Sequence, residues 1–177
     1  MKKTIIIGII IILFLIGIKK VNSKEFKIPS EAIRLRVVAN SNNNTDQKVK
    51  YEVTNNIQNK IYELLKDTKG IEEARIIINN NLEYLSGEVE KTLDKEGYPF
   101  SYELKYGLNY FPKKEYKGVT YEEGYYESLV VTIGEGEGDN WWCVLFPPLC
   151  LLEADENTTG DVEYQFFVAK MINQFFK

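Results

Sequence analysis

The chain has 177 residues, of which 44% are hydrophobic and 27% charged, and its formal net charge is −4. This composition is typical of one globular domain and argues against a disordered chain. A net acidic chain lacks the basic face with which nucleic-acid-binding proteins neutralise phosphates, so we expect no nucleic-acid partner. The sequence has no histidine, the commonest general base and zinc ligand, and we expect no metal ion and no cofactor.

The first residues have the layout of an export signal. Two lysines precede an apolar run over residues 4–18, and two more lysines follow it. The run is shorter than the ~20 residues that usually span a bilayer. Residues 1–23 are therefore a cleaved signal peptide or a retained N-terminal membrane anchor, and we favour cleavage after Ser23. Both alternatives place the rest of the chain outside the cytoplasm, as a linker over 24–32 and one domain over 33–177.

The first half of the domain has one strand and then helices. Alternating apolar residues predict a strand over 33–38 with one solvated face. Apolar residues at helical spacing predict a helix over 45–66 and a second one over 74–93. Because β-branched residues favour sheets, the three isoleucines at 76–78 leave a short strand open as an alternative.

The second half is richer in strands. Alternation predicts strands over 100–110 and 129–133, with a turn region over 112–124 between them. The glycine-rich acidic stretch over 134–140 predicts a flexible hairpin turn, and a final helix begins at Asp161. The order of elements predicts an α+β fold. We expect a mostly antiparallel sheet of about four strands with about three helices packed on it, preceded by the N-terminal apolar helix.

Residues 140–150 form the most distinctive segment, which we call the Trp-Cys segment. It holds both tryptophans, both cysteines and two prolines. Its apolar run predicts a buried central strand that ends at a Pro-Pro corner, or a hydrophobic surface for a partner. Both interpretations hold if 141–145 is buried and 146–152 is displayed. The candidate partner-binding residues are Trp141, Trp142, Phe146, Pro147, Pro148 and Leu149.

Cys143 and Cys150 are the only cysteines of the chain. An even count outside the cytoplasm slightly favours a disulfide, whose small ring would contain both prolines. The alternative is two buried thiols that behave as small hydrophobic groups.

Three glutamates lie close together in the sequence: Glu122, Glu123 and Glu127. A pair of carboxylates is the machinery of glycoside hydrolysis, so a cell-wall hydrolase is the alternative function. With 26 acidic residues in the chain, such proximity is expected by chance. Arg34 and Arg36 belong to the solvated face of the first strand, where we expect water around them or a pairing with these carboxylates or a partner.

Three parts of the sequence resemble the stage II sporulation protein R family of endospore-forming bacteria. They are residues 33–41 with 46–48, residues 126–129 with 133–136, and the Trp-Cys segment. The chain departs from the family pattern at 151–153, where an aromatic residue is more familiar than Leu-Leu-Glu.

The resemblance implies a function that composition does not indicate. Members of this family are made in the forespore and exported into the space between the forespore and the mother cell. There they activate a membrane-embedded aspartic protease in the mother-cell membrane, which removes the pro-sequence from the inactive precursor of sigma E. The resemblance implies a signalling protein without catalytic residues of its own. An envelope-associated protein whose tryptophans enter lipid is the remaining alternative.

Overall fold

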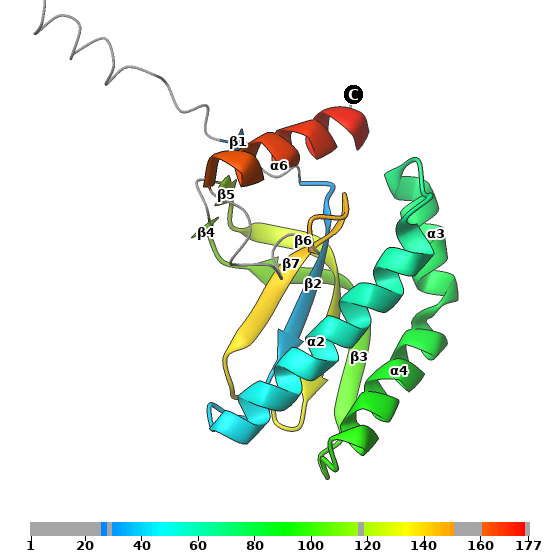
Figure 1. Cartoon of the computed structure of the whole chain (residues 1–177), viewed down its shortest axis with the longest axis vertical. Helices are drawn as coiled ribbons and strands as arrows, with labels where there is room; N and C mark the ends of the chain where they lie inside the picture. Colours follow the sequence, from blue (N-terminus) through cyan, green and yellow to red (C-terminus); the bar gives the residue numbers. More distant parts are fainter. Residues whose placement is uncertain (1–25, 28–29, 117–118, 151–160, 176–177) are drawn as a thin grey trace, which may run out of the picture.

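The computed structural model describes residues 26–27, 30–116, 119–150 and 161–175 (Figure 1). The expected signal peptide or anchor, residues 1–23, lies outside these ranges. Within them, no helix is both long enough and apolar enough to cross a membrane. The described chain is an α+β protein with a mostly antiparallel four-stranded sheet, as the sequence predicts.

The larger sheet has the strand order β3-β6-β2-β7. Its strands are β2 (Ile33–Val38), β3 (Tyr102–Phe111), β6 (Gly124–Ile133) and β7 (Asn140–Phe146). β3 pairs antiparallel with β6, and β7 pairs antiparallel with β2, whereas the central strands β2 and β6 run parallel. Because a tight turn cannot join parallel strands, the chain between β2 and β6 makes a long crossover, which carries three helices and the strands β3, β4 and β5.

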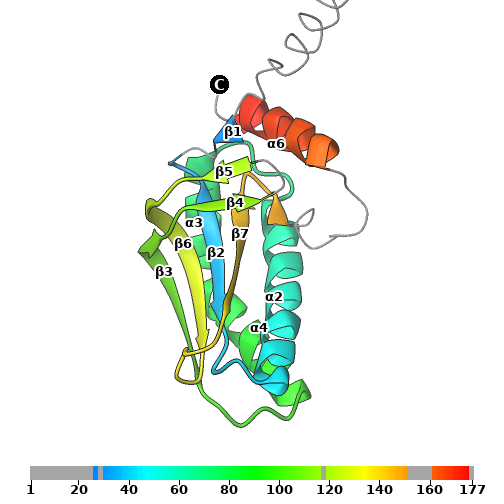
Figure 2. The ribbon, with the colours of Figure 1, turned by 90° about the vertical axis from the view of Figure 1, so that its left-hand side faces the viewer.

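The crossover helices α2 (Asn44–Leu65), α3 (Ile71–Asn80) and α4 (Leu82–Lys95) cover one face of the larger sheet (Figures 1 and 2). α2 buries an apolar row with helical spacing: Val49, Val53, Ile57, Ile61 and Leu65. This row packs in one core with the inward side chains of the four strands. The predicted amphipathic helix therefore positions the sheet beneath it.

Two helices occupy the region over 74–93 where the sequence predicts one. They meet at Asn81, whose backbone N–H donates to the Ile78 carbonyl (3.1 Å) and whose side-chain amide donates to the Ile77 carbonyl (2.8 Å). These bonds satisfy carbonyls at the end of α3 and stop it. The strand alternative over 76–78 is wrong, because these residues are helical and Ile78 is fully buried.

A smaller sheet with the order β1-β5-β4 lies over one end of the opposite face (Figure 2). Its strands are β1 (Phe26–Lys27), β4 (Lys114–Tyr116) and β5 (Val119–Tyr121). β1 falls in the predicted linker, and the other two fall in the predicted turn region over 112–124. Strands of two or three residues are too short to show a periodic pattern. The last described helix, α6 (Asp161–Phe175), packs beside β1 and begins at Asp161 as the sequence predicts. The described residues hold four helices where about three are expected, because the region over 74–93 forms two.

Arg34 corrects the prediction of a solvated face on β2. Its side chain is only 1% exposed, because three aromatic rings surround the guanidinium. The Arg34 Cζ atom lies 3.4 Å from the ring centroid of Tyr126, 5.1 Å from that of Phe111 and 5.8 Å from that of Tyr121. Such cation–π contacts strengthen when water is excluded. The small sheet thus turns one end of the predicted solvated face into a second core, whereas Arg36 stays partly exposed.

The start of α2 is held by the carboxylate of Asp46. Its Oδ1 accepts a hydrogen bond from the Tyr98 hydroxyl (2.6 Å), and its Oδ2 accepts one from the Asn40 side-chain amide (2.8 Å). These bonds, with the one from Tyr98 the strongest, lower the pKa of Asp46 to about 2. Burial and the bond to Asp46 raise the pKa of Tyr98. One carboxylate therefore joins α2 to the loops after β2 and after α4.

We predict that Asp46→Asn lowers the free energy of unfolding at pH 7 by about 1–3 kcal/mol, because a charged hydrogen-bond acceptor is lost from a buried site. The folded pKa of Asp46, about 2, lies below its ordinary value of 3.8. Its stabilisation is therefore present above about pH 4 and is lost as the pH falls toward 2. Urea unfolding from pH 7 to pH 2 should show the gap between wild type and variant narrowing. A gap that stays constant, or an equal loss in the exposed Asp94→Asn control, would contradict this role.

Candidate functional site

β7 places the two tryptophans of the Trp-Cys segment on opposite faces of the larger sheet. Trp141 packs against the core beneath the helices. Trp142 lies on the other face, with its ring centroid 5.5 Å from that of Phe111 and 4.9 Å from the Lys114 Nζ atom. Both indoles are partly exposed, so the predicted burial of this strand is complete only from Cys143 onward.

The corner after β7 turns inward. Phe146 and Leu149 are fully buried. The Phe146 ring lies 4.8 Å from that of Phe175 in α6, and Leu149 joins the second core between the small sheet and α6. The expected display of residues 146–152 is therefore wrong for Phe146, Pro147 and Leu149, because α6 and the small sheet cover this end.

Three of the six candidate partner-binding residues keep exposed surface: Trp141, Trp142 and Pro148. Residues 151 and 152, which the sequence analysis also expects on display, lie outside the described residues. Partner binding through the remaining three side chains stays a prediction.

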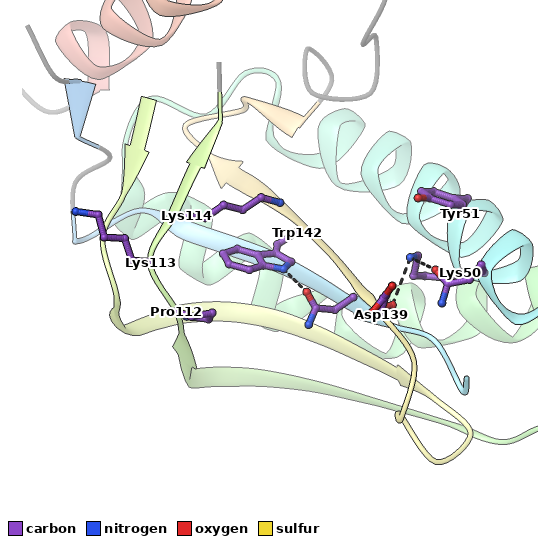
Figure 3. A pocket seen from close by; sticks show the side chains of 9 residues that line it. Lys50, Tyr51, Pro112, Lys113, Lys114, Asp139 and Trp142 are labelled. Atoms are coloured by element: carbon purple, nitrogen blue, oxygen red, sulfur yellow. Dashed lines mark hydrogen bonds between the residues drawn. The ribbon is translucent and has the colours of Figure 1, made fainter. Parts of the chain in front are cut away.

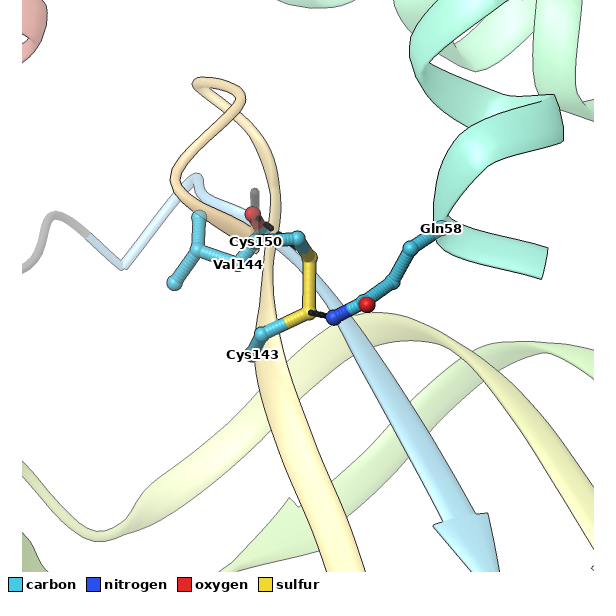
Figure 4. Close-up of a disulfide and its surroundings, with 4 residues drawn as sticks. All are labelled: Gln58, Cys143, Val144 and Cys150. Atoms are coloured by element: carbon cyan, nitrogen blue, oxygen red, sulfur yellow. Dashed lines mark hydrogen bonds between the residues drawn. A yellow bond between two sulfur atoms is a disulfide. The ribbon is translucent and has the colours of Figure 1, made fainter. Parts of the chain in front are cut away.

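A disulfide joins Cys143 to Cys150 across the corner, with the two Cα atoms 5.1 Å apart (Figure 4). The Gln58 side-chain amide of α2 lies over it, with its Nε2 atom 3.6 Å from the Cys143 Sγ atom. Both cysteines are buried. The bridge therefore closes the Pro-Pro corner into a small ring beneath α2 and is part of the interior.

The three glutamates of the hydrolase alternative have different partners. Glu127 accepts hydrogen bonds from the Tyr106 hydroxyl (2.5 Å) and from Arg75 Nε (2.6 Å), and burial with this contact raises the pKa of Tyr106. Glu123 accepts a bond from a tyrosine hydroxyl, and Glu122 lies 3.5 Å from a lysine. Such pairing is typical of structural carboxylates, and none of these contacts joins one glutamate to another.

The glycine-rich turn over 134–140 is tied to the loop after β2, although the sequence predicts a flexible turn. The backbone N–H of Glu135 donates to the Asn40 side-chain oxygen (3.0 Å), and that of Glu137 donates to the Asn40 carbonyl (3.1 Å). Asp139 N–H donates to the side-chain oxygen of Asn42 (2.6 Å). Two asparagines, through their side-chain oxygens and one backbone carbonyl, therefore accept hydrogen bonds from the backbone of the turn.

α2 carries a second buried row, which is polar and spaced by four residues: Asp46, Lys50, Thr54 and Gln58. Lys50 is only 2% exposed, and its ammonium donates to Gln47 Oε1 (2.5 Å) and to the Asp139 carbonyl (3.3 Å). Burial lowers the pKa of Lys50. Lys50 is not among the residues that the sequence predicts for a site, although the regular spacing of this polar row beside the apolar row is a signal that points to it.

A surface groove of about 420 Å³ lies between α2, the end of the glycine-rich turn and the segment that leads into β4 (Figure 3). We call it the lysine groove. Its lining residues are Gln47, Lys50 and Tyr51, residues 112–114, and Asp139, Asn140 and Trp142. Asn140 and Trp142 come from the Trp-Cys segment, Gln47 comes from the first family-like segment, and the second family-like segment begins the turn that ends at Asp139. Two of the three family-like segments therefore contribute lining residues to this groove, and the second is joined to it through the turn.

We predict that Gly138→Ala lowers the free energy of unfolding by about 1–3 kcal/mol, because an added Cβ would collide with the Ser41 carbonyl oxygen where the two loops touch. Gly87→Ala is the matched control, since Gly87 lies in α4 with open space around it. This control should be neutral or stabilising by up to about 1 kcal/mol. Urea unfolding of both variants tests the contact, and equal stability of the two would contradict it.

The comparisons with known proteins agree on one family. The profile described as "Stage II sporulation protein R (spore_II_R)" matches residues 29–156. The curated stage II sporulation protein R of Bacillus subtilis (strain 168) is 39% identical over 163 residues, which cover 86% of this chain and 73% of that protein. No solved structure matches the chain. The chain therefore belongs to the stage II sporulation protein R family and has a signalling role in sporulation.

Proposed function

We propose that this protein is the exported signal that activates a membrane-embedded aspartic protease in the mother-cell membrane. In this proposal residues 1–23 direct export across the forespore membrane, and the domain acts in the space between the two cells. The activated protease then removes the pro-sequence from the inactive precursor of sigma E. The protein itself acts as a ligand and carries out no chemistry.

The family match over most of the chain carries this proposal. The structure adds a physical basis, since two of the three family-like segments line the lysine groove and Trp142 stays partly exposed there. Tryptophan is over-represented among residues that dominate binding energy at protein interfaces. The corner of the Trp-Cys segment contributes indirectly, because it is buried and anchors β7.

Activation by docking has an energetic condition. A ligand shifts a receptor toward its active state only when it binds that state more tightly than the inactive one. A tenfold preference corresponds to about 1.4 kcal/mol, which one interface residue can supply. The hydrolase alternative gains no support, because Glu122, Glu123 and Glu127 are each engaged by a different partner.

We predict that full-length chain, co-expressed with the membrane protease and the sigma-E precursor in a host that does not sporulate, triggers cleavage of the precursor. Trp142→Ala should weaken activation at least about tenfold, the effect of losing a hot-spot indole. Immunoblots of the precursor and its shorter product measure cleavage, with the amount of signal protein titrated.

Tyr84→Ala is the matched control, because this exposed aromatic residue lies in α4, outside the lysine groove. It should activate like wild type. Circular dichroism of each purified variant checks folding. If wild-type chain gives no cleavage at the expression level at which the protease accumulates, the proposed function is wrong. If Trp142→Ala folds and activates fully, Trp142 is not part of the docking surface.

A further inference from the structure

The lysine groove concentrates positive charge on an acidic protein. Three lysines and one aspartate line it, whereas the whole chain has a formal net charge of −4. Figure 3 shows Lys50 beside Asp139 on the α2 side of the groove and Lys114 beside Trp142 on the other side. A concave surface on which one sign of charge is in excess attracts ligands of the opposite sign.

Lys50 is the buried charge of this groove. Its ammonium donates to two neutral acceptors, Gln47 Oε1 and the Asp139 carbonyl, and lies 4.5 Å from the ring centroid of Tyr51. An ammonium has three N–H donors, and within the described residues two of them have these acceptors. Burial lowers the pKa of Lys50, and the charge of the nearby Asp139 carboxylate opposes this effect because it favours the protonated form. A carboxylate in the groove would add a charged hydrogen-bond acceptor for the third N–H.

The opposite wall combines a cation with an apolar surface. Lys114 is exposed and lies over the Trp142 ring, and the neighbouring Lys113 has a side chain that is 57% exposed and approaches Glu122 only to 3.5 Å. Exposed pairs of this kind contribute little stability, so Lys113 can exchange Glu122 for a carboxylate of a partner. The indole provides contact area for the stem of an acidic side chain.

We infer that the lysine groove binds an extended acidic segment of the protein receptor, an inference that rests on the proposed function. The segment places one carboxylate against Lys50 and another against the Lys113 and Lys114 side. An anionic membrane surface is a poorer occupant, because a flat array of headgroups cannot enter the groove that Lys50 lines, whereas a single projecting acidic side chain can. Charge complementarity of this kind also speeds encounter between partners and makes their association sensitive to salt.

Two groove variants test the inference in the full chain. Lys50→Met removes the buried charge and keeps most of the side chain's length. Lys113→Glu combined with Lys114→Glu reverses the exposed charges, so it keeps the test decisive if Lys50→Met fails to fold. Lys69→Glu combined with Lys105→Glu is the matched control, because it changes the net charge equally at exposed positions outside the groove.

The first measurement is fluorescence anisotropy with a labelled synthetic peptide of alternating glutamate and glycine, and with its glutamine counterpart. Wild type should bind the glutamate peptide with an affinity that falls as salt rises from 50 to 200 mM, and should not bind the glutamine peptide. Both groove variants should bind at least about tenfold more weakly, while the control binds like wild type. Absence of this selective binding in wild type, or equal binding by folded groove variants, overturns the inference.

The second measurement is precursor cleavage in the co-expression assay. Loss of cleavage in the reversed-charge variant, with full cleavage by the control, supports the inference. Full cleavage by the reversed-charge variant overturns it and leaves the proposed function standing. Absence of cleavage with wild type, when the glutamate peptide still binds, refutes the proposed function instead. Flotation with phosphatidylglycerol vesicles completes the test, since vesicle binding that the groove substitutions abolish, without any change in peptide binding, assigns the lysines to a membrane and overturns the inference.

Discussion

The hydrogen bonds of the Asp46 carboxylate hold together the start of α2 and the loops beside it, and the lysine groove depends on this arrangement. It accepts hydrogen bonds from Asn40 in the loop after β2 and from Tyr98 in the loop after α4, so it fixes the start of α2 relative to both. Asn40 in turn accepts the backbone N–H groups that hold the glycine-rich turn. That turn carries the Asp139 carbonyl that meets Lys50. Loss of the buried acceptor at Asp46 would therefore weaken a hydrogen-bond network that runs from the loop after α4 through α2 and Asn40 to the glycine-rich turn.

The two buried rows of α2 have different structural roles. The apolar row packs on the sheet, and its burial follows from the hydrophobic effect alone. The polar row is directional: Asp46 holds the loop after β2, Lys50 reaches the end of the turn, and Gln58 lies on the disulfide. Hydrogen bonds of fixed geometry set the rotation of the helix more tightly than apolar contacts do. The position of α2 consequently determines how its groove residues face those of β7.

The sequence predicts the helices and strands whose periodic pattern extends over many residues. It does not predict the short strands of the smaller sheet, nor the burial that this sheet and α6 cause. Alternation identifies β3 and helical spacing identifies α2, because each persists over ten residues or more. The same alternation assigns Arg34 to solvent, since nothing within β2 reveals that Tyr121, from a strand of three residues, will cover it. Phe146 is misplaced for the same reason, as its cover comes from Phe175 in α6. The groove is harder still to predict, because Lys50 and Lys114 become neighbours of one cavity only through the packing of α2 and β4 beside β7.

Because most of the corner of the Trp-Cys segment is buried, the corner itself offers little surface to a partner. A displayed hydrophobic loop would have to be ordered on binding, which costs free energy for each immobilised side chain. Here the disulfide, the Phe146 contact with α6 and the asparagine-held turn fix the backbone on both sides of Trp142 before a partner arrives. A preformed surface of this kind keeps more of its contact energy for discrimination between two states of a receptor. In the proposed docking, the buried residues of the segment therefore act indirectly, because they hold the backbone that carries Trp142 in place.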